Sequence, residues 1–144
     1  MFTHTVVHYG EIALKGKNRP EFEKKLVDNI RFAIGKEKTI KRLFGRIIID
    51  SSDSATLNSL RNVFGVAHFS PCVVADLDMD DIKQKALRIA KNVRIQKKNP
   101  TFKIETTRGN KSFSLTSMQT NEKVGDFVNE KMKWKVNLTD PDVI

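Results

Sequence analysis

Residues 9–20 read YGEIALKGKNRP and join a strand-like run to an amphipathic helix. Asn18 is a favourable N-cap residue, Pro20 suits the first helical turn, and Glu21 stands three residues after Asn18. Unpaired N–H groups at a helix start favour anions, and three cations lie there: Lys15, Lys17 and Arg19. The stretch therefore predicts a strand–loop–helix corner that can hold a phosphate. Because it lacks the glycine content of a P-loop, a solvated loop is the alternative interpretation.

The rest of the first half alternates between strand and helix patterns. Strands are predicted from β-branched and aromatic content over residues 3–9, 39–43, 46–50 and 66–75. One helix follows Asn18, and a second, capped by Ser52 or Asp53, is predicted to bury Leu57, Leu60, Val63 and Phe64. The resulting order over residues 1–75, β-α-β-β-α-β, is that of a ferredoxin-like domain, a name that implies no iron–sulfur cluster.

The second half opens with an acidic linker in which Asp78 is the expected N-cap. The helix after it is predicted to bury a stripe formed by Ile82, Ala86, Ile89 and Val93. Four elements follow: a strand over 101–107, a turn over 108–111, a helix from Ser117 or Thr120 to Lys133, and a strand starting at Val136. We therefore expect an α+β chain with a ferredoxin-like domain (1–75) and an α/β domain (76–144). Because two strands make a poor sheet, we expect the second domain to be incomplete at its C-terminal end, so that either a longer polypeptide or a second copy supplies the missing part.

A net charge of +9 is the strongest bulk signal. It is concentrated between Lys83 and Lys111, where ten basic residues accompany one acid, Glu105. Segregated positive charge suits a polyanion such as nucleic acid, and a solvated basic face is the alternative. No apolar run approaches the roughly 20 residues of a membrane span, and no secretory signal is visible. One cysteine and three scattered histidines give neither a disulfide framework nor zinc spacing, so we expect a reducing, cytoplasmic setting without membrane or metal.

Ten residues are candidate nucleic-acid contacts, because cations and amides bind phosphates and fix register on the polyanion. The main set lies in the second half and comprises Lys91, Arg94, Lys98, Arg108, Asn110 and Lys111. The first three are chosen on charge alone, and the last three occupy a glycine turn. A second set lies in the first half and comprises Lys15, Lys17, Arg19 and Arg46. Phe113 is open to two interpretations, stacking on a base or packing in the core.

Residues 9–19 and, downstream, residues 108–117 (RGNKSFSLTS) with Val124-Gly125 carry a resemblance in matching order. They resemble the N-terminal region of the tRNA 4-thiouridine synthetases, the ThiI-type tRNA sulfurtransferases that also serve thiamine thiazole biosynthesis. The second half resembles their THUMP domain. The resemblance implies a tRNA-binding region that docks the acceptor stem and the 3′ end. It also implies ATP, magnesium and a persulfide sulfur donor for the full-length protein, and a homodimer as one expected assembly.

No catalytic residue and no cofactor site is expected in this chain. The resemblance implies that the family's chemistry needs a Ser-Gly-Gly-x-Asp-Ser pyrophosphate loop and downstream cysteines, and neither occurs in these 144 residues. Cys72 is expected to be a structural thiol, and His8 and His68 to be strand-face residues. Whether the chain acts as an enzyme therefore stays open. The alternatives are a standalone THUMP-type RNA-binding adaptor without a catalytic domain and a small enzyme acting on an acidic metabolite.

Overall fold

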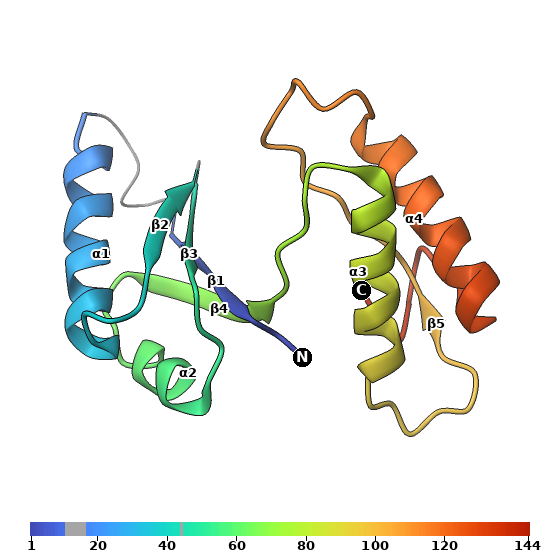
Figure 1. Cartoon of the computed structure of the whole chain (residues 1–144), viewed down its shortest axis with the longest axis horizontal. Coiled ribbons are helices and arrows are strands. Elements are labelled where there is room, and N and C mark those ends of the chain that lie inside the picture. Colours follow the sequence, from blue (N-terminus) through green and yellow to red (C-terminus); the bar gives the residue numbers. More distant parts are fainter. Residues whose placement is uncertain (11–16, 44) are drawn as a thin grey trace. The chain divides into compact units, whose positions relative to one another are not determined.

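The computed structural model describes residues 1–10, 17–43 and 45–144, which form two compact units, residues 2–74 and residues 75–144 with Met1. The first unit contains β1 (His4–Tyr9), α1 (Arg19–Ile34), β2 (Ile40–Leu43), β3 (Arg46–Ile49), α2 (Ser54–Leu60) and β4 (Val66–Cys72). The second contains α3 (Met79–Asn92), β5 (Thr101–Phe102), α4 (Ser117–Met132) and β6 (Lys135–Val136) (Figure 1).

The first unit is a four-stranded antiparallel sheet in the order β2-β3-β1-β4. β1 lies in the interior of the sheet, where His8 is opposite Arg46 of β3 and opposite His68 of β4. This strand order with the β-α-β-β-α-β chain order is ferredoxin-like, so the predicted fold of the first half is confirmed.

Helices α1 and α2 cover one face of that sheet (Figure 1). Alternate residues of β1 and β3 point to this face and are buried, because successive side chains of a strand lie on opposite sides. The core consists of Val7 and Tyr9 from β1, Ile47 and Ile49 from β3, Leu26, Ile30 and Ile34 from α1, and Leu60 from α2. The remaining alternate residues, such as His8 and Ile48, therefore lie on the opposite face.

The two helices of this unit begin differently from one another. Asp53 caps α2 by accepting a hydrogen bond of 2.7 Å from the Thr56 N–H, as predicted. Asn18 is the N-cap residue of α1, as predicted, and its carbonyl accepts the first helical hydrogen bond from the Phe22 N–H, but its side chain makes no capping hydrogen bond. Its backbone is already in the right-handed helical region, which turns the side chain away from the N–H groups that a cap must reach. Phe64 is wrong as a core residue, because α2 ends at Leu60 and the ring is 87% exposed.

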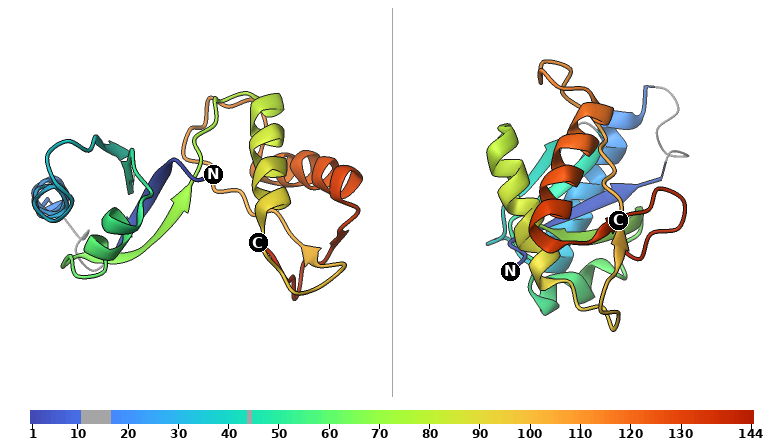
Figure 2. Two further views of the ribbon diagram at one scale, coloured as in Figure 1. Left: turned by 60° about the horizontal axis from the view of Figure 1, so that its bottom comes forward. Right: turned by 90° about the vertical axis from the view of Figure 1, so that its right-hand side faces the viewer.

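In the second unit α3 and α4 pack side by side, and a short parallel pair of strands lies beside them (Figure 2). The core cluster comprises Ala90 of α3, Phe102 of β5, and Val124 and Val128 of α4. Trp134 packs against this cluster with its ring edge toward Phe102, at a centroid distance of 6.3 Å. The buried stripe of α3 is rotated from the predicted one, since Leu87 and Ala90 are buried whereas Ile89 and Val93 are only half-buried.

The predicted strand over residues 101–107 is reduced to β5, two residues long. Thr101 and Phe102 pair with Lys135 and Val136, and the Lys103 N–H donates to the Val143 carbonyl. After Lys103 no partner strand is present in the described part of the unit, so the alternating pattern of residues 104–107 has nothing to pair with. None of the helices in the described ranges is both long and apolar enough to cross a membrane.

Candidate nucleic-acid interface

The first group of predicted contacts lies at the C-terminal end of α3. Asp78 caps this helix by accepting a hydrogen bond of 3.0 Å from the Asp81 N–H. The first turn of the helix is acidic, and its last turn carries Lys91. Lys91, Arg94 and Lys98 are all exposed, and within the described residues none of the three forms an ion pair or side-chain hydrogen bond. Their charges are therefore available to an external anion.

Nearby cations differ in this respect. Lys97 donates to the Asp142 carboxylate at 2.8 Å, and the Lys103 ammonium lies 2.6 Å from the Glu105 carboxylate. Lys85 is 3.8 Å from Asp81 one helical turn away. These three side chains contribute little to the positive electrostatic potential that an external anion would feel, because a nearby carboxylate compensates each charge. The sequence predictions had already left all three out of the contact set.

The second group, in the turn at residues 108–111, is organised differently. The Arg108 guanidinium is half-buried and donates to three main-chain carbonyl oxygens, those of Asn110, Lys111 and Phe113. The Asn110 Oδ1 atom accepts from the N–H and the hydroxyl of Ser112, at 2.9 and 2.6 Å. Arg108 and Asn110 thus hold the loop in shape, and Lys111 is the exposed cation that the loop presents.

The loop continues into the start of α4. Thr116 accepts from the Gln119 N–H and Gln119 accepts from the Thr116 N–H, which forms a complete capping box. Phe113 is half-buried and lines a shallow hollow of about 420 Å³ with Leu115 and with Leu77 to Met79 at the start of α3. The Phe113 ring is therefore neither buried in the core nor fully exposed to solvent.

The two groups consequently lie at opposite ends of α3. Lys91, Arg94 and Lys98 follow its C-terminal end, whereas the loop after Arg108 contacts the hollow at its N-terminal end. A helix of 14 residues is about 20 Å long at roughly 1.5 Å per residue. The loop also lies near the acidic first turn, so the positive field is stronger at the C-terminal end of α3.

Two further cations were not among the predicted contacts. Lys83 of α3 and Lys131 of α4 place their ammonium groups 5.8 and 5.7 Å from the centroid of the Phe127 ring. The spacing of Phe127 and Lys131, four residues apart on one helix, could have indicated this pair, but the contribution from α3 required the packing of two helices. Cations from α3 and from α4 therefore meet at the Phe127 ring.

Arg19 and Arg46, two of the predicted contacts in the first unit, lie on different faces of the sheet. Arg19 lies 2.9 Å from the Glu23 carboxylate, which also accepts from the Tyr9 hydroxyl at 2.8 Å. Arg46 lies on the sheet face opposite to the helices, beside His8. Lys17 is exposed, and Lys15 lies outside the described residues. Glu23 thus joins the end of β1, through Tyr9, to the first turns of α1, through Arg19.

His8 and His68 stack on each other across β1 and β4, with ring centroids 4.2 Å apart and planes inclined by 15°. This confirms the prediction that both are strand-face residues. Burial, the neighbouring His68 and the Arg46 guanidinium together lower the pKa of His8 below its ordinary value. Cys72, on the same strand as His68, is half-buried, and burial raises the pKa of its thiol. Across the described ranges no group of three or more His, Cys, Asp or Glu side chains is arranged to hold a metal.

Both halves of the chain match known domain families. Residues 4–70 match the ThiI ferredoxin-like domain, and residues 77–144 match the THUMP domain. A "Probable tRNA sulfurtransferase" of Moorella thermoacetica is 36% identical over 147 residues, which cover 99% of this chain and 37% of that protein. A protein of the same name from Mycoplasmopsis synoviae is 37% identical over 144 residues, which cover 100% of this chain and 36% of the relative. The chain thus spans little more than a third of the length of these curated relatives.

Two solved structures resemble the model over almost its whole length. One is a 4-thiouridine synthetase in complex with RNA and with bound ATP, at a TM-score of 0.78 and 27% identity over 99% of this chain and 37% of that one. The other is the protein PH1313 from Pyrococcus horikoshii, at a TM-score of 0.83 and 34% identity over 97% of this chain and 48% of that one. The likeness covers both units in the same order along the chain.

Proposed function

Because the chain belongs to the ThiI-type tRNA sulfurtransferase family and carries its ferredoxin-like and THUMP domains, we propose that it is the tRNA-binding region of a tRNA 4-thiouridine synthetase. In this proposal it docks the acceptor stem and the 3′ end of tRNA. The observation that carries it is the group of exposed, unpaired cations after α3, Lys91, Arg94 and Lys98, in the unit that matches the THUMP domain.

The chemistry of this group suits an RNA backbone. Cations that are not neutralised by the protein's own carboxylates release counterions from phosphates on binding, which gives affinity with little sequence information. Helical RNA is recognised chiefly through its shape and backbone, whereas unpaired nucleotides at an end offer faces for stacking. Lys83 and Lys131 extend the positive charge over both helices. Lys111 adds one exposed cation at the other end of α3.

The whole protein's activity is a further part of the proposal. It would use ATP and magnesium to activate a tRNA uridine and then introduce sulfur from a persulfide donor, in the cytoplasm and as a homodimer. In this proposal ATP and magnesium are held by residues of the whole protein other than these, and the present chain holds the RNA.

Binding of labelled tRNA at several salt concentrations tests the proposal. The triple variant Lys91→Ala, Arg94→Ala, Lys98→Ala should bind tRNA at least tenfold more weakly. The slope of log K against log salt should fall by about 2, because each phosphate contact contributes roughly 0.7 to 0.9. A matched control removes three exposed cations from the other unit, Lys24→Ala, Lys25→Ala and Lys36→Ala, and should change the slope by less than half as much.

Equal losses in the two triple variants would show a general effect of net charge and would contradict the assigned site. A tRNA that lacks its 3′ terminal nucleotides tests the docked end, and it should bind wild-type protein more weakly than intact tRNA. Unchanged affinity for the shortened tRNA would remove the 3′ end from the proposal while leaving the acceptor stem. A binding signal in isothermal titration calorimetry with small acidic metabolites, but not with tRNA, would instead favour the small-enzyme alternative.

A further inference from the structure

The sheet of the first unit has one face that no helix of that unit covers. Helices α1 and α2 both pack on the face formed by Val7, Tyr9, Ile47 and Ile49. The other face carries the alternate residues of β1 and β3, among them His8, Arg46 and Ile48, and their neighbours on β2 and β4. An antiparallel sheet that exposes one face normally presents polar residues there. This face carries aliphatic side chains in addition to its cations and imidazoles.

Cationic and titratable groups form one row across three strands. Arg46 of β3, His8 of β1 and His68 of β4 stand opposite one another, and the two imidazoles are stacked. The pKa of His8 is lowered by burial and by these two neighbours, which means that the row already disfavours added positive charge. An anion bound beside the row would relieve that repulsion.

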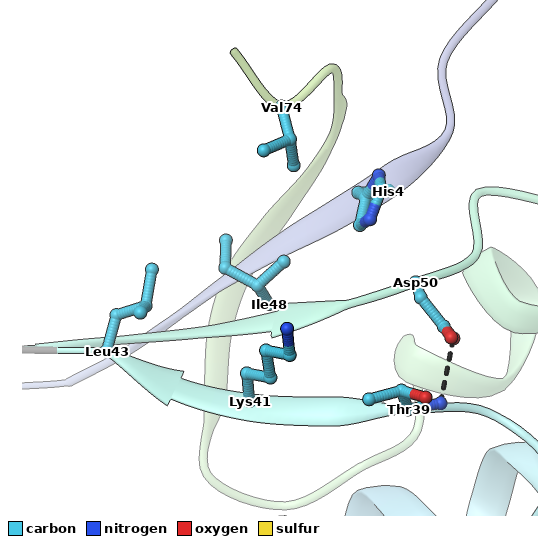
Figure 3. A pocket seen from close by; sticks show the side chains of 7 residues that line it. All are labelled: His4, Thr39, Lys41, Leu43, Ile48, Asp50 and Val74. Atoms are coloured by element: carbon cyan, nitrogen blue, oxygen red, sulfur yellow. Dashed lines mark hydrogen bonds between the residues drawn. The ribbon is translucent and has the colours of Figure 1, made fainter. Parts of the chain in front are cut away.

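A hollow of about 400 Å³ lies next to this row on the same face. Figure 3 shows its lining residues: His4, Thr39, Lys41, Leu43, Ile48, Asp50 and Val74. Ile48 forms part of the floor, Leu43 and Val74 add apolar surface, and both apolar residues are 53% exposed. Lys41 is exposed and has no ion-pair partner in the described part of the chain. The acid, Asp50, accepts a hydrogen bond of 2.8 Å from the Thr39 N–H, and the side chain of Thr39, followed by this N–H, lowers the pKa of the carboxyl.

We propose that this open face binds a short single-stranded RNA segment, with a base over Ile48 and Leu43 and phosphates against Lys41 and Arg46. Charge complementarity selects a polyanion, because the two cations, Lys41 and Arg46, outnumber the one carboxylate of the hollow, which is engaged in a hydrogen bond. The apolar floor selects a single strand, since a duplex keeps its base faces stacked inside and offers only its backbone. The proposal goes beyond the cations at α3, and it rests on the proposed function only for the class of ligand.

Fluorescence anisotropy with a labelled seven-nucleotide oligouridine tests this proposal on the full chain. The double variant Lys41→Ala, Arg46→Ala should weaken binding of the single strand about tenfold and binding of a blunt RNA duplex no more than twofold. The matched control Lys24→Ala, Lys25→Ala removes the same charge from exposed positions of α1 and should leave single-strand binding within twofold. Leu43→Thr, at an exposed strand position, should weaken single-strand binding severalfold without any change of charge.

Three outcomes of these binding measurements test the sheet site separately from the proposed function. Weaker single-strand binding in the Lys41, Arg46 variant, with unchanged binding in the Lys91, Arg94, Lys98 variant, supports a separate site on the sheet. Unchanged single-strand binding in the Lys41, Arg46 variant overturns the site, even where the α3 variant loses tRNA. Equal weakening of single strand and duplex overturns the preference for a single strand, because it reduces the face to a nonspecific positive surface.

Discussion

The Arg108 guanidinium donates a hydrogen bond of 2.9 Å to the main-chain carbonyl oxygen of Phe113, five residues further along the chain. The same guanidinium also bonds the carbonyl oxygens of Asn110 and Lys111. A planar group with several fixed donors can join three acceptors in this way, whereas an ammonium cannot match the same geometry. Arg108 is therefore a positioning residue for the loop that presents Lys111.

Arg108→Lys tests that role because it retains the charge and loses the fork of donors. We expect Arg108→Lys to weaken tRNA binding nearly as much as Arg108→Ala, by about three- to tenfold, and to increase amide hydrogen exchange at Phe113. Lys111→Ala, by comparison, should lower the salt slope by about one without altering that exchange. If Arg108→Lys behaves like wild type in both measurements, charge alone accounts for Arg108.

Glu23 connects three groups of the first unit, since its carboxylate accepts from the Tyr9 hydroxyl and the Arg19 guanidinium and lies 3.9 Å from Arg42. Glu23→Gln should lower the free energy of unfolding by about 1 to 2 kcal/mol, the usual loss for a hydrogen bond to a charged group. Urea unfolding followed by circular dichroism measures the change. Glu21→Gln on the same helix, at an exposed position, is the control and should change stability by less than about 0.5 kcal/mol.

Tyr9 offers a spectroscopic check on the same cluster, because it is the single tyrosine of the chain. Burial, followed by the hydrogen bond to Glu23, raises the pKa of its hydroxyl above the ordinary value. We expect ultraviolet titration of the folded Glu23→Gln variant to give a lower pKa for Tyr9 than in wild type. An unchanged titration curve would mean that burial alone sets the pKa.

Gly65 is required by its backbone conformation and by its neighbours. Its φ is +97°, and an added Cβ atom would lie 3.2 Å from Leu26 Cδ1 and 3.3 Å from Phe22 Cζ. Gly65→Ala should therefore destabilise the protein by about 1 to 3 kcal/mol, through left-handed strain and crowding of the core. Thermal unfolding measures this loss, and Gly109→Ala, where nothing lies within 4 Å of the added atom, is the comparison. Equal effects at the two positions would contradict the explanation.

Asp142 holds the second unit together through a hydrogen bond to Lys97 and two to Thr101, and these lower the pKa of its carboxyl to about 2. Because the folded pKa lies below that of the unfolded chain, the ionised carboxylate stabilises the fold above about pH 4, and this stabilisation is lost as the pH falls toward 2. Asp142→Asn should lower the urea midpoint near neutral pH, and the difference from wild type should shrink in acid. Fluorescence of Trp134, the single tryptophan, follows this unit. A pH-independent difference would exclude the linkage.

Local signals in the sequence were sufficient for the order of the strands and helices in the first unit. The alternation of Val7 and Tyr9, the helical spacing of Leu26, Ile30 and Ile34, and the Asp53 cap each follow from the residues concerned and their near neighbours. The predictions that were wrong, or right only in part, depended on geometry that residue type does not fix. Asn18 is an N-cap residue whose backbone is helical and whose side chain makes no capping hydrogen bond. Phe64 has helical spacing but lies beyond the end of α2.

The site shows the same division. Charge density along the sequence selected Lys91, Arg94 and Lys98, and their exposure without ion pairs is consistent with that selection, although RNA contact stays a prediction for all ten candidates. Sequence could not distinguish Lys111 from Arg108 and Asn110, which lie within three residues of one another. Only the loop hydrogen bonds separate the exposed cation from the two residues that hold its backbone.

The order of strands and helices, the segregation of positive charge and the family were set by the sequence alone, because each depends on residue type and on spacing over a few turns. Tertiary structure alone decided which cations are paired, which loop residues support others, and which face of the first sheet, the one with His8, Arg46 and Ile48, is left uncovered by the helices of its own unit. The physical reason is that these properties depend on strand register and on helix packing between residues far apart in the chain. Neighbouring residues on a strand point to opposite faces, so a surface is assembled from several strands at once.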